Sequence, residues 1–305
     1  MKRLVVVLAL AAVVVACERR ADVADPARDC AELEDAAARI AACTTVAEDA
    51  TNSTEARAAA YAGRGAAREA SGEVTPALRD YEAALRLDGA QTLALIGRGR
   101  LLVRSGQLDA AEPLLARASG SDTSGAAHEL LARIALQQGR FDDAITHFDA
   151  SLAQAQSATA MAGRARARQR SGDLTGATSD YDAAVRLDGT LSEARAGRCW
   201  LDLNEERNLE RARTDAEAAV AGDPQNTEAQ LCRGVLQLRG GEWANAQASF
   251  DAVLSVERGN PVALFGRGVA RRRSGDNDGH EDMNLARDFD RHIGEQFDDM
   301  GVETF

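Results

Sequence analysis

Residues 58–89 read AAAYAGRGAAREASGEVTPALRDYEAALRLDG, and residues 158–189 read ATAMAGRARARQRSGDLTGATSDYDAAVRLDG. The second stretch begins one hundred residues after the first, and 19 of their 32 positions are identical. The segments between and after them keep the same skeleton at spacings of 33 to 35 residues. A fixed period of this size indicates that each unit is one small supersecondary element, stacked on its neighbours along the chain.

Each unit places a small residue in its first half, a turn glycine near its middle and an alanine in its second half. The small residues are Gly65, Gly99, Ala132, Ala165, Cys199, Gly234 and Gly268. Turn glycines follow them, except in the fifth unit, which has one extra residue in its turn. Small residues let two helices approach closely, and glycine is the common residue at the end of a helix. The skeleton therefore predicts pairs of short helices.

This skeleton resembles the tetratricopeptide repeat over about residues 58–290. The resemblance implies an all-α fold, a right-handed superhelical solenoid of about seven helix pairs with a C-terminal capping helix. It also implies a concave groove, lined by the first helix of each pair, which binds a protein or peptide. A C-terminal helix is expected from the apolar residues after the repeats, at helical spacing from Met283 to Phe297.

We expect five segments: a signal peptide (1–16), a tether (17–28), an N-terminal helical half-unit (29–57), the repeat array (58–279) and a capping helix with its tail (280–305). Lys2 and Arg3 precede the uncharged apolar run 4–16, which is too short to span a bilayer and suits a signal sequence. The run ends at Cys17 in a pattern that resembles the bacterial lipobox. We therefore expect lipidation at Cys17 and an outer-membrane lipoprotein that faces the periplasm. The alternative is cleavage nearby and a soluble periplasmic or secreted protein.

Four cysteines remain if Cys17 carries lipid, which is an even number for an oxidising compartment. The local pairing joins Cys30 to Cys43 and Cys199 to Cys232. Cys30 and Cys43 cannot bond within one straight helix, so the chain must turn between them. Buried free thiols are the alternative, and they suit Cys199 and Cys232 better than the first pair.

The composition and the motifs argue against catalysis. The net charge is −12, which disfavours non-specific nucleic-acid binding. The four histidines are scattered, and we expect His147 at the surface, in the place where other units carry aspartate. The acidic run 276–282 has its glycine in the wrong place for a calcium loop. No serine has a nucleophile-elbow context. The sequence therefore predicts no catalytic residues, no metal and no cofactor.

Arginine recurs just before the small residue of most units, and an aspartate recurs in the second half of three. If the two face each other across a helix pair, they form structural ion pairs. The predicted pairs are Arg64 with Asp80, Arg164 with Asp180, and Arg198 with Asp215.

The residue just after each small residue lines the concave groove in the family that the repeats resemble. We call this series the inner stripe; it reads Ala66, Arg100, Arg133, Arg166, Trp200, Val235 and Val269. Three arginines followed by a tryptophan suit the carboxylates of an acidic peptide, with the indole as an anchor. The alternative is that these arginines pair with nearby acids, as Arg133 would with Glu129, one turn before it.

The predicted function is a non-catalytic adaptor in the cell envelope, which binds a protein or peptide in the groove and is held to the membrane by its lipid. A self-association module and a periplasmic chaperone of loose specificity are the alternatives. The oligomeric state is left open.

Overall fold

The computed structural model describes residues 25–303. The expected signal peptide (1–16), Cys17 and most of the expected tether lie outside the described residues. The described chain is helical throughout and contains no strand. It divides into two compact units between Ala94 and Leu95, and each is described by itself. No helix within residues 25–303 has the length and apolar character needed to cross a membrane.

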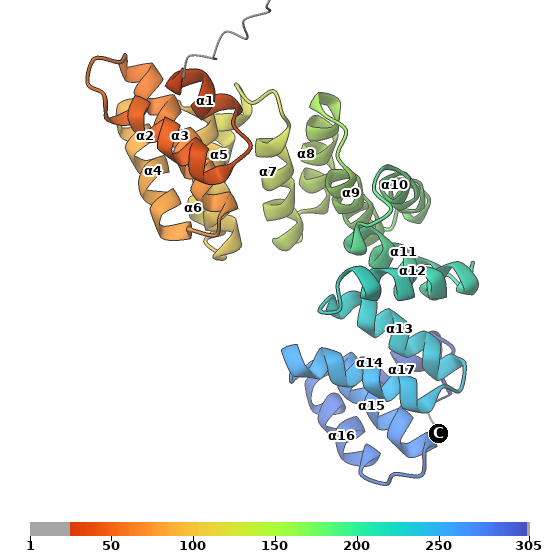
Figure 1. The fold of residues 1–305 in the computed structure, drawn as a ribbon. Helices are drawn as coiled ribbons and strands as arrows, with labels where there is room; N and C mark the ends of the chain where they lie inside the picture. Colours follow the sequence, from red (N-terminus) through yellow and green to blue (C-terminus); the bar gives the residue numbers. More distant parts are fainter. Residues whose placement is uncertain (1–24, 304–305) are drawn as a thin grey trace, which may run out of the picture. The chain divides into compact units, whose positions relative to one another are not determined.

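Seven helix pairs follow two N-terminal helices, and one short helix comes last (Figure 1). The first helices of the pairs are α3 (Thr54–Ala70), α5 (Thr92–Arg104), α7 (Ala126–Gln137), α9 (Ala158–Ser171), α11 (Ser192–Asn204), α13 (Thr227–Arg239) and α15 (Pro261–Arg273). The second helices are α4 (Val74–Leu87), α6 (Leu108–Ser119), α8 (Phe141–Gln154), α10 (Leu174–Leu187), α12 (Leu209–Gly222), α14 (Trp243–Val256) and α16 (Gly279–Phe289). The flanking helices are α1 (Pro26–Glu32), α2 (Ala36–Glu48) and α17 (Ile293–Asp299). The stack of helix pairs that the repeats predict is confirmed.

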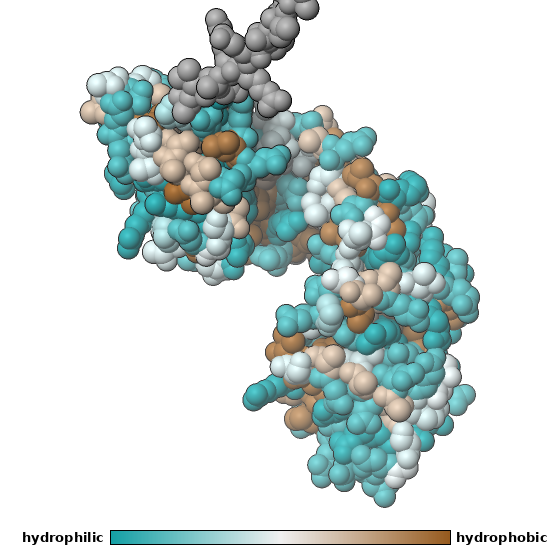
Figure 2. Space-filling view, in the orientation of Figure 1, coloured by the Kyte–Doolittle hydropathy of each residue, from teal (hydrophilic) through white to brown (hydrophobic). Residues whose placement is uncertain are grey.

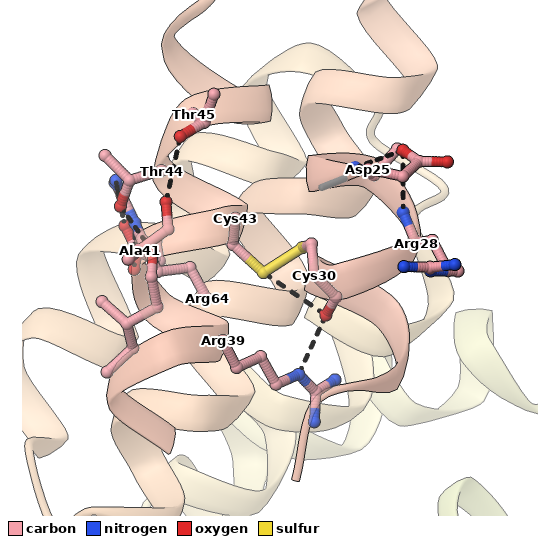
Figure 3. Close-up of a disulfide and its surroundings, with 12 residues drawn as sticks. Asp25, Arg28, Cys30, Arg39, Ala41, Cys43, Thr44, Thr45 and Arg64 are labelled. Atoms are coloured by element: carbon pink, nitrogen blue, oxygen red, sulfur yellow. Dashed lines mark hydrogen bonds and ion pairs between the residues drawn. A yellow bond between two sulfur atoms is a disulfide. The ribbon is translucent and has the colours of Figure 1, made fainter. Parts of the chain in front are cut away.

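The N-terminal unit begins with two helices joined by a disulfide. Cys30 on α1 and Cys43 on α2 are bonded with their Cα atoms 4.6 Å apart, and the chain turns between them after Glu32 (Figure 3). The Nε of Arg39 donates to the main-chain oxygen of Cys30 at 3.0 Å. The first helix starts at Pro26, within the range expected for the tether, because Asp25 caps its free N–H groups.

In the C-terminal unit, each helix packs on the next along the chain. First helices also contact one another from pair to pair, as α9 does with α11 and α11 with α13. Among the described residues, consecutive second helices make no comparable set of contacts. The face built from the first helices is therefore the inner face of this unit. Cys199 on α11 and Cys232 on α13 are bonded on two of these inner helices, with their Cα atoms 6.4 Å apart.

The turns inside the pairs follow the repeat pattern. Six pairs turn at a glycine with positive φ, between 73° at Gly139 and 92° at Gly172, where a Cβ would be strained. The fifth pair lacks this glycine, and Glu206 adopts a φ of 49° in its place. The small residues serve close packing, since a Cβ on Gly65 would lie 2.8 Å from the Tyr81 ring.

The C-terminal segment forms two helices where the spacing of apolar residues predicts one. The second helix of the seventh pair, α16, ends at Phe289, and the side chain of Asp290 then accepts from the main-chain N–H of His292 at 2.9 Å. The short α17 follows and packs against α15. A local aspartate turn thus outweighs the continuous helical pattern.

Candidate functional site

Paired arginine and aspartate side chains connect the two helices of several pairs. In each predicted pair the guanidinium donates two hydrogen bonds to one carboxylate. The Nε and Nη2 distances are 3.0 and 2.8 Å for Arg64–Asp80, 2.8 and 2.7 Å for Arg164–Asp180, and 2.6 and 2.9 Å for Arg198–Asp215. All three aspartates are buried. These residues support the fold and do not form a ligand site.

The seventh pair carries a fourth bidentate contact of this kind, which the sequence analysis missed. Arg267 donates to Asp282 at 2.8 and 2.6 Å. The recurring arginine was visible there, but the aspartate lies in a segment where the repeat pattern fades.

The third pair differs, because its second helix carries His147 in place of aspartate. His147 is half-buried, which corrects the expected surface position, and its Nδ1 lies 3.2 Å from the Nδ1 of His128.

The inner stripe lies on the first helices, but its members have different surroundings. Arg100 is half-buried on α5. Arg133 on α7 donates to Glu129, one turn earlier, at 3.0 Å, which is the alternative pairing considered for it. Val235 and Val269 are fully buried in one apolar cluster with Phe297. The stripe is therefore not open over its whole length.

Arg166 and Trp200 are the two stripe residues that the structure brings together. Arg166 on α9 contacts Glu193 at 3.4 Å and Glu228 at 2.5 Å. Glu228 lies on α13, two pairs further along the chain. The indole Nε1 of Trp200, on the intervening α11, donates to the main-chain oxygen of Glu228 at 3.0 Å. Three consecutive first helices are thus joined across the inner face.

We call the contact of Arg166, Trp200 and Glu228 the junction. Three cavities lie next to it. The largest, of about 500 Å³, is lined by Arg166, Arg170, Trp200 and Asn204 among others. A second of about 390 Å³ shares Arg166 and Arg170 with it and extends to Gln137 on α7. A third of about 350 Å³ shares Trp200 and Asn204 and extends to Met300, beyond α17. The inner face therefore offers neighbouring cavities from α7 to α11, with Arg166 and Trp200 each lining two of them.

Partial burial shifts the titration of this junction. The pKa of Glu228 is raised, because burial disfavours its charged form more than the Arg166 charge favours it. Burial lowers the pKa of the Arg166 guanidinium, but the charges of Glu228 and Glu193 outweigh it and the net shift is upward. Arg166 therefore stays charged, while Glu228 takes up a proton more readily than an ordinary glutamate.

The family model of the tetratricopeptide repeat matches residues 96–159, 129–192, 200–254 and 233–279, which together span more than half of the chain. The chain belongs to the tetratricopeptide repeat family. The junction of Arg166 and Trp200 is therefore part of a tetratricopeptide groove, on the helices that line it.

Solved structures show the same fold at low sequence identity. A tetratricopeptide repeat protein from Parabacteroides merdae has a TM-score of 0.53 and 17% identity, over 79% of this chain and 97% of that one. The hetero-tetramer Cut9–Hcn1 of the APC/C has a TM-score of 0.68 and 11% identity, over 88% of this chain and 53% of that one. Pseudomonas aeruginosa pilF has a TM-score of 0.57 and 15% identity, over 68% of this chain and 94% of that one. No curated protein matches the sequence.

The tetratricopeptide repeats also carry a second series of inner residues that the sequence analysis missed. It lies four residues after the inner stripe, hence on the same helix face, in every pair except the first, which has Ala70 there. We call it the donor row; it reads Arg104, Gln137, Arg170, Asn204, Arg239 and Arg273. The recurrence of hydrogen-bond donors at one repeat position was a signal that could have identified it.

Within residues 25–303, no three His, Cys, Asp or Glu side chains are grouped so that they could hold a metal ion.

Proposed function

We propose that this chain is a non-catalytic adaptor of the bacterial cell envelope. It binds a protein or peptide on its inner face, around Arg166 and Trp200, and is held to the membrane by a lipid on Cys17. The observation that carries the binding site is the series of neighbouring cavities along α7, α9 and α11, two of them lined by Arg166 and two by Trp200. Tetratricopeptide repeats generally present such a surface to a partner.

The surroundings of the site favour an extended ligand with both polar and apolar parts. Arg166 and Arg170 offer guanidinium groups for carboxylates, and Trp200 offers a half-buried aromatic surface next to them. The face of the molecule seen in Figure 2 is mainly hydrophilic, with small apolar patches. Binding there requires a few anchors and no large apolar interface.

Substitution of the two anchors tests this function. Trp200→Ala and Arg166→Met in the full chain should each reduce capture of the envelope partner at least tenfold, since each removes a central contact. Arg186→Met, an exposed position on α10, serves as the matched control and should leave capture unchanged. Equal capture by all three variants would show that the partner does not use this site.

The membrane anchor has a separate test, because it rests on residues outside the described part of the chain. Cys17→Ala should move the protein from the membrane fraction to the soluble fraction and abolish its labelling with fatty acid. Unchanged partition and labelling would refute lipidation at Cys17 and leave the binding site untouched.

A further inference from the structure

The C-terminal segment, residues 293–303, covers the inner face of the last two pairs. Ile293 and Phe297 are fully buried, and the rings of Phe297 and Phe265 lie 4.9 Å apart. The stripe valines Val235 and Val269 belong to the same apolar cluster. The protein thus shows, with its own chain, how a polypeptide segment is seated on this face.

Two arginines hold the main chain of the C-terminal segment. Arg239 on α13 donates to the main-chain oxygen of Met300 at 3.1 Å. Arg273 on α15 donates to the main-chain oxygen of Glu303 at 3.0 Å. Both carbonyls lie past the end of α17, where the helix does not use them. These two contacts reach main-chain atoms, whereas the buried side chains of Ile293 and Phe297 supply the apolar part of the interaction.

Arg239 and Arg273 are the last two members of the donor row. Gln137, Arg170 and Asn204 occupy the same repeat position on α7, α9 and α11. All three are exposed, each lines at least one of the three cavities, and among the described residues their side chains make no hydrogen bond. Amide and guanidinium groups are good donors to carbonyl oxygen. The open part of the inner face therefore repeats the donors that are engaged in the covered part.

We propose that Gln137, Arg170 and Asn204 bind main-chain carbonyls of a partner's non-helical segment, as Arg239 and Arg273 bind those of the C-terminal segment. This inference rests on the proposed function and specifies its ligand: a non-helical stretch with an apolar side chain against Trp200. The proposed peptide site adjoins the seat of the C-terminal segment, because one cavity is lined by Trp200 and Asn204 and also by Met300 of that segment. Such a site accepts several related sequences, since the donors contact atoms that every peptide shares.

The test uses the full chain and a fluorescent synthetic peptide with the sequence of residues 293–303, titrated by fluorescence anisotropy. We expect saturable binding that weakens at least tenfold in the triple variant Gln137→Ala, Arg170→Ala, Asn204→Ala. A second peptide carries glycolic acid in place of Gly301, which converts the Met300 carbonyl to an ester, a poorer acceptor. It should bind about three- to tenfold more weakly than the first.

The matched control replaces the same three residue types on second helices: Gln154→Ala, Arg186→Ala and Asn245→Ala. It should bind the peptide like the unmodified chain. Thermal melting of both triple variants checks their folding, and exposed alanine substitutions in helices should leave it nearly unchanged.

The outcomes separate this inference from the proposed function. Absence of saturable binding overturns the inference, and so does equal binding by the donor-row variant. If Trp200→Ala weakens binding while the donor-row variant and the ester do not, the groove binds peptides but not through these donors. If neither Trp200→Ala nor Arg166→Met changes binding, the proposed site itself is wrong.

Discussion

Arg166 on α9 is ion-paired with Glu228 on α13, although an entire helix pair lies between them in the sequence. In a stack of repeats most contacts join only neighbouring units. This pair therefore fixes the spacing of three first helices beside the cavities. Trp200, on the intervening helix, donates to the main chain of the same glutamate, so its indole reports on the junction.

Acid should weaken the Arg166–Glu228 pair at a higher pH than that at which an ordinary glutamate titrates. The folded-state pKa of Glu228 is raised above 4.5, first by burial and further by Glu193, with Arg166 and Arg170 opposing the shift. Between 4.5 and that raised pKa the folded state binds more protons than the unfolded state, so this group's contribution to stability falls as pH rises. Trp200 fluorescence in a Trp243→Phe background should change with a midpoint above 4.5. The transition should be absent in Glu228→Gln; its persistence there would exclude Glu228 as the titrating group.

The buried ion pairs should contribute far more to stability than the exposed ones. Asp180 accepts three hydrogen bonds from Arg164 and Arg168 and is buried, so Asp180→Ala leaves each guanidinium with only an exposed partner, Asp149 or Asp173. We predict a loss of about 3 kcal/mol in the free energy of unfolding. Asp143→Ala removes the exposed partner of Arg140 and should cost less than about 1 kcal/mol. Urea denaturation of both variants gives the comparison, and similar losses would contradict a buried role for Asp180.

The turn of the fifth pair is strained, and a glycine should relieve it. Glu206 has a φ of 49°, a conformation that costs a residue with a Cβ about 1 kcal/mol. Glu206→Gly should therefore stabilise the protein by about 0.5–1 kcal/mol, in spite of the greater freedom of glycine in the unfolded chain. Gly172→Ala, at the equivalent turn with a φ of 92°, should have the opposite effect. Thermal melting of both variants measures these changes in stability. A lower melting temperature for Glu206→Gly would refute backbone strain at Glu206.

The histidine pair of the third repeat should make stability depend on pH. The pKa of His147 is lowered, first by burial and then by His128, while Asp143 and Glu112 oppose the shift and Arg140 adds to it. Between the lowered pKa and 6.5 the unfolded state binds more protons, so stability falls as pH decreases through that window. His147→Gln should remove this part of the pH dependence, as measured by denaturation between pH 5 and pH 8. An unchanged slope in the variant would assign the dependence to other groups.

The helix pairs could be predicted because their skeleton recurs in every unit, and the internal ion pairs because arginine and aspartate recur together in three units. Gly139 and Gly172 mark equivalent turns, and the arginine–aspartate pairs predicted from the sequence recur at separations of 16 or 17 residues. The repeat gives the period, and the period places these residues in contact. The fifth turn was recognisable as irregular from its extra residue, but the positive φ of Glu206 was not.

The junction at Arg166 could not be predicted in the same way. Its contact with Glu228 depends on how far each pair is rotated against the next, and a repeat pattern contains no such information. The position of the C-terminal segment on the inner face could not be predicted for a similar reason. Phe297 showed a helical spacing, but nothing in the sequence indicated that it would fold back onto Phe265 and cover two stripe valines.

Site-specific photo-crosslinking in the native envelope tests the central claim most directly. A photoreactive amino acid at position 204, which lines two of the three cavities, is compared with the same amino acid at position 186, on a second helix. We predict that position 204 crosslinks a discrete protein partner, that Trp200→Ala in the same chain removes this product, and that position 186 yields none. A partner crosslinked only from position 186 would contradict binding on the inner face, and a product at 204 that persists in Trp200→Ala would contradict the anchoring role of Trp200.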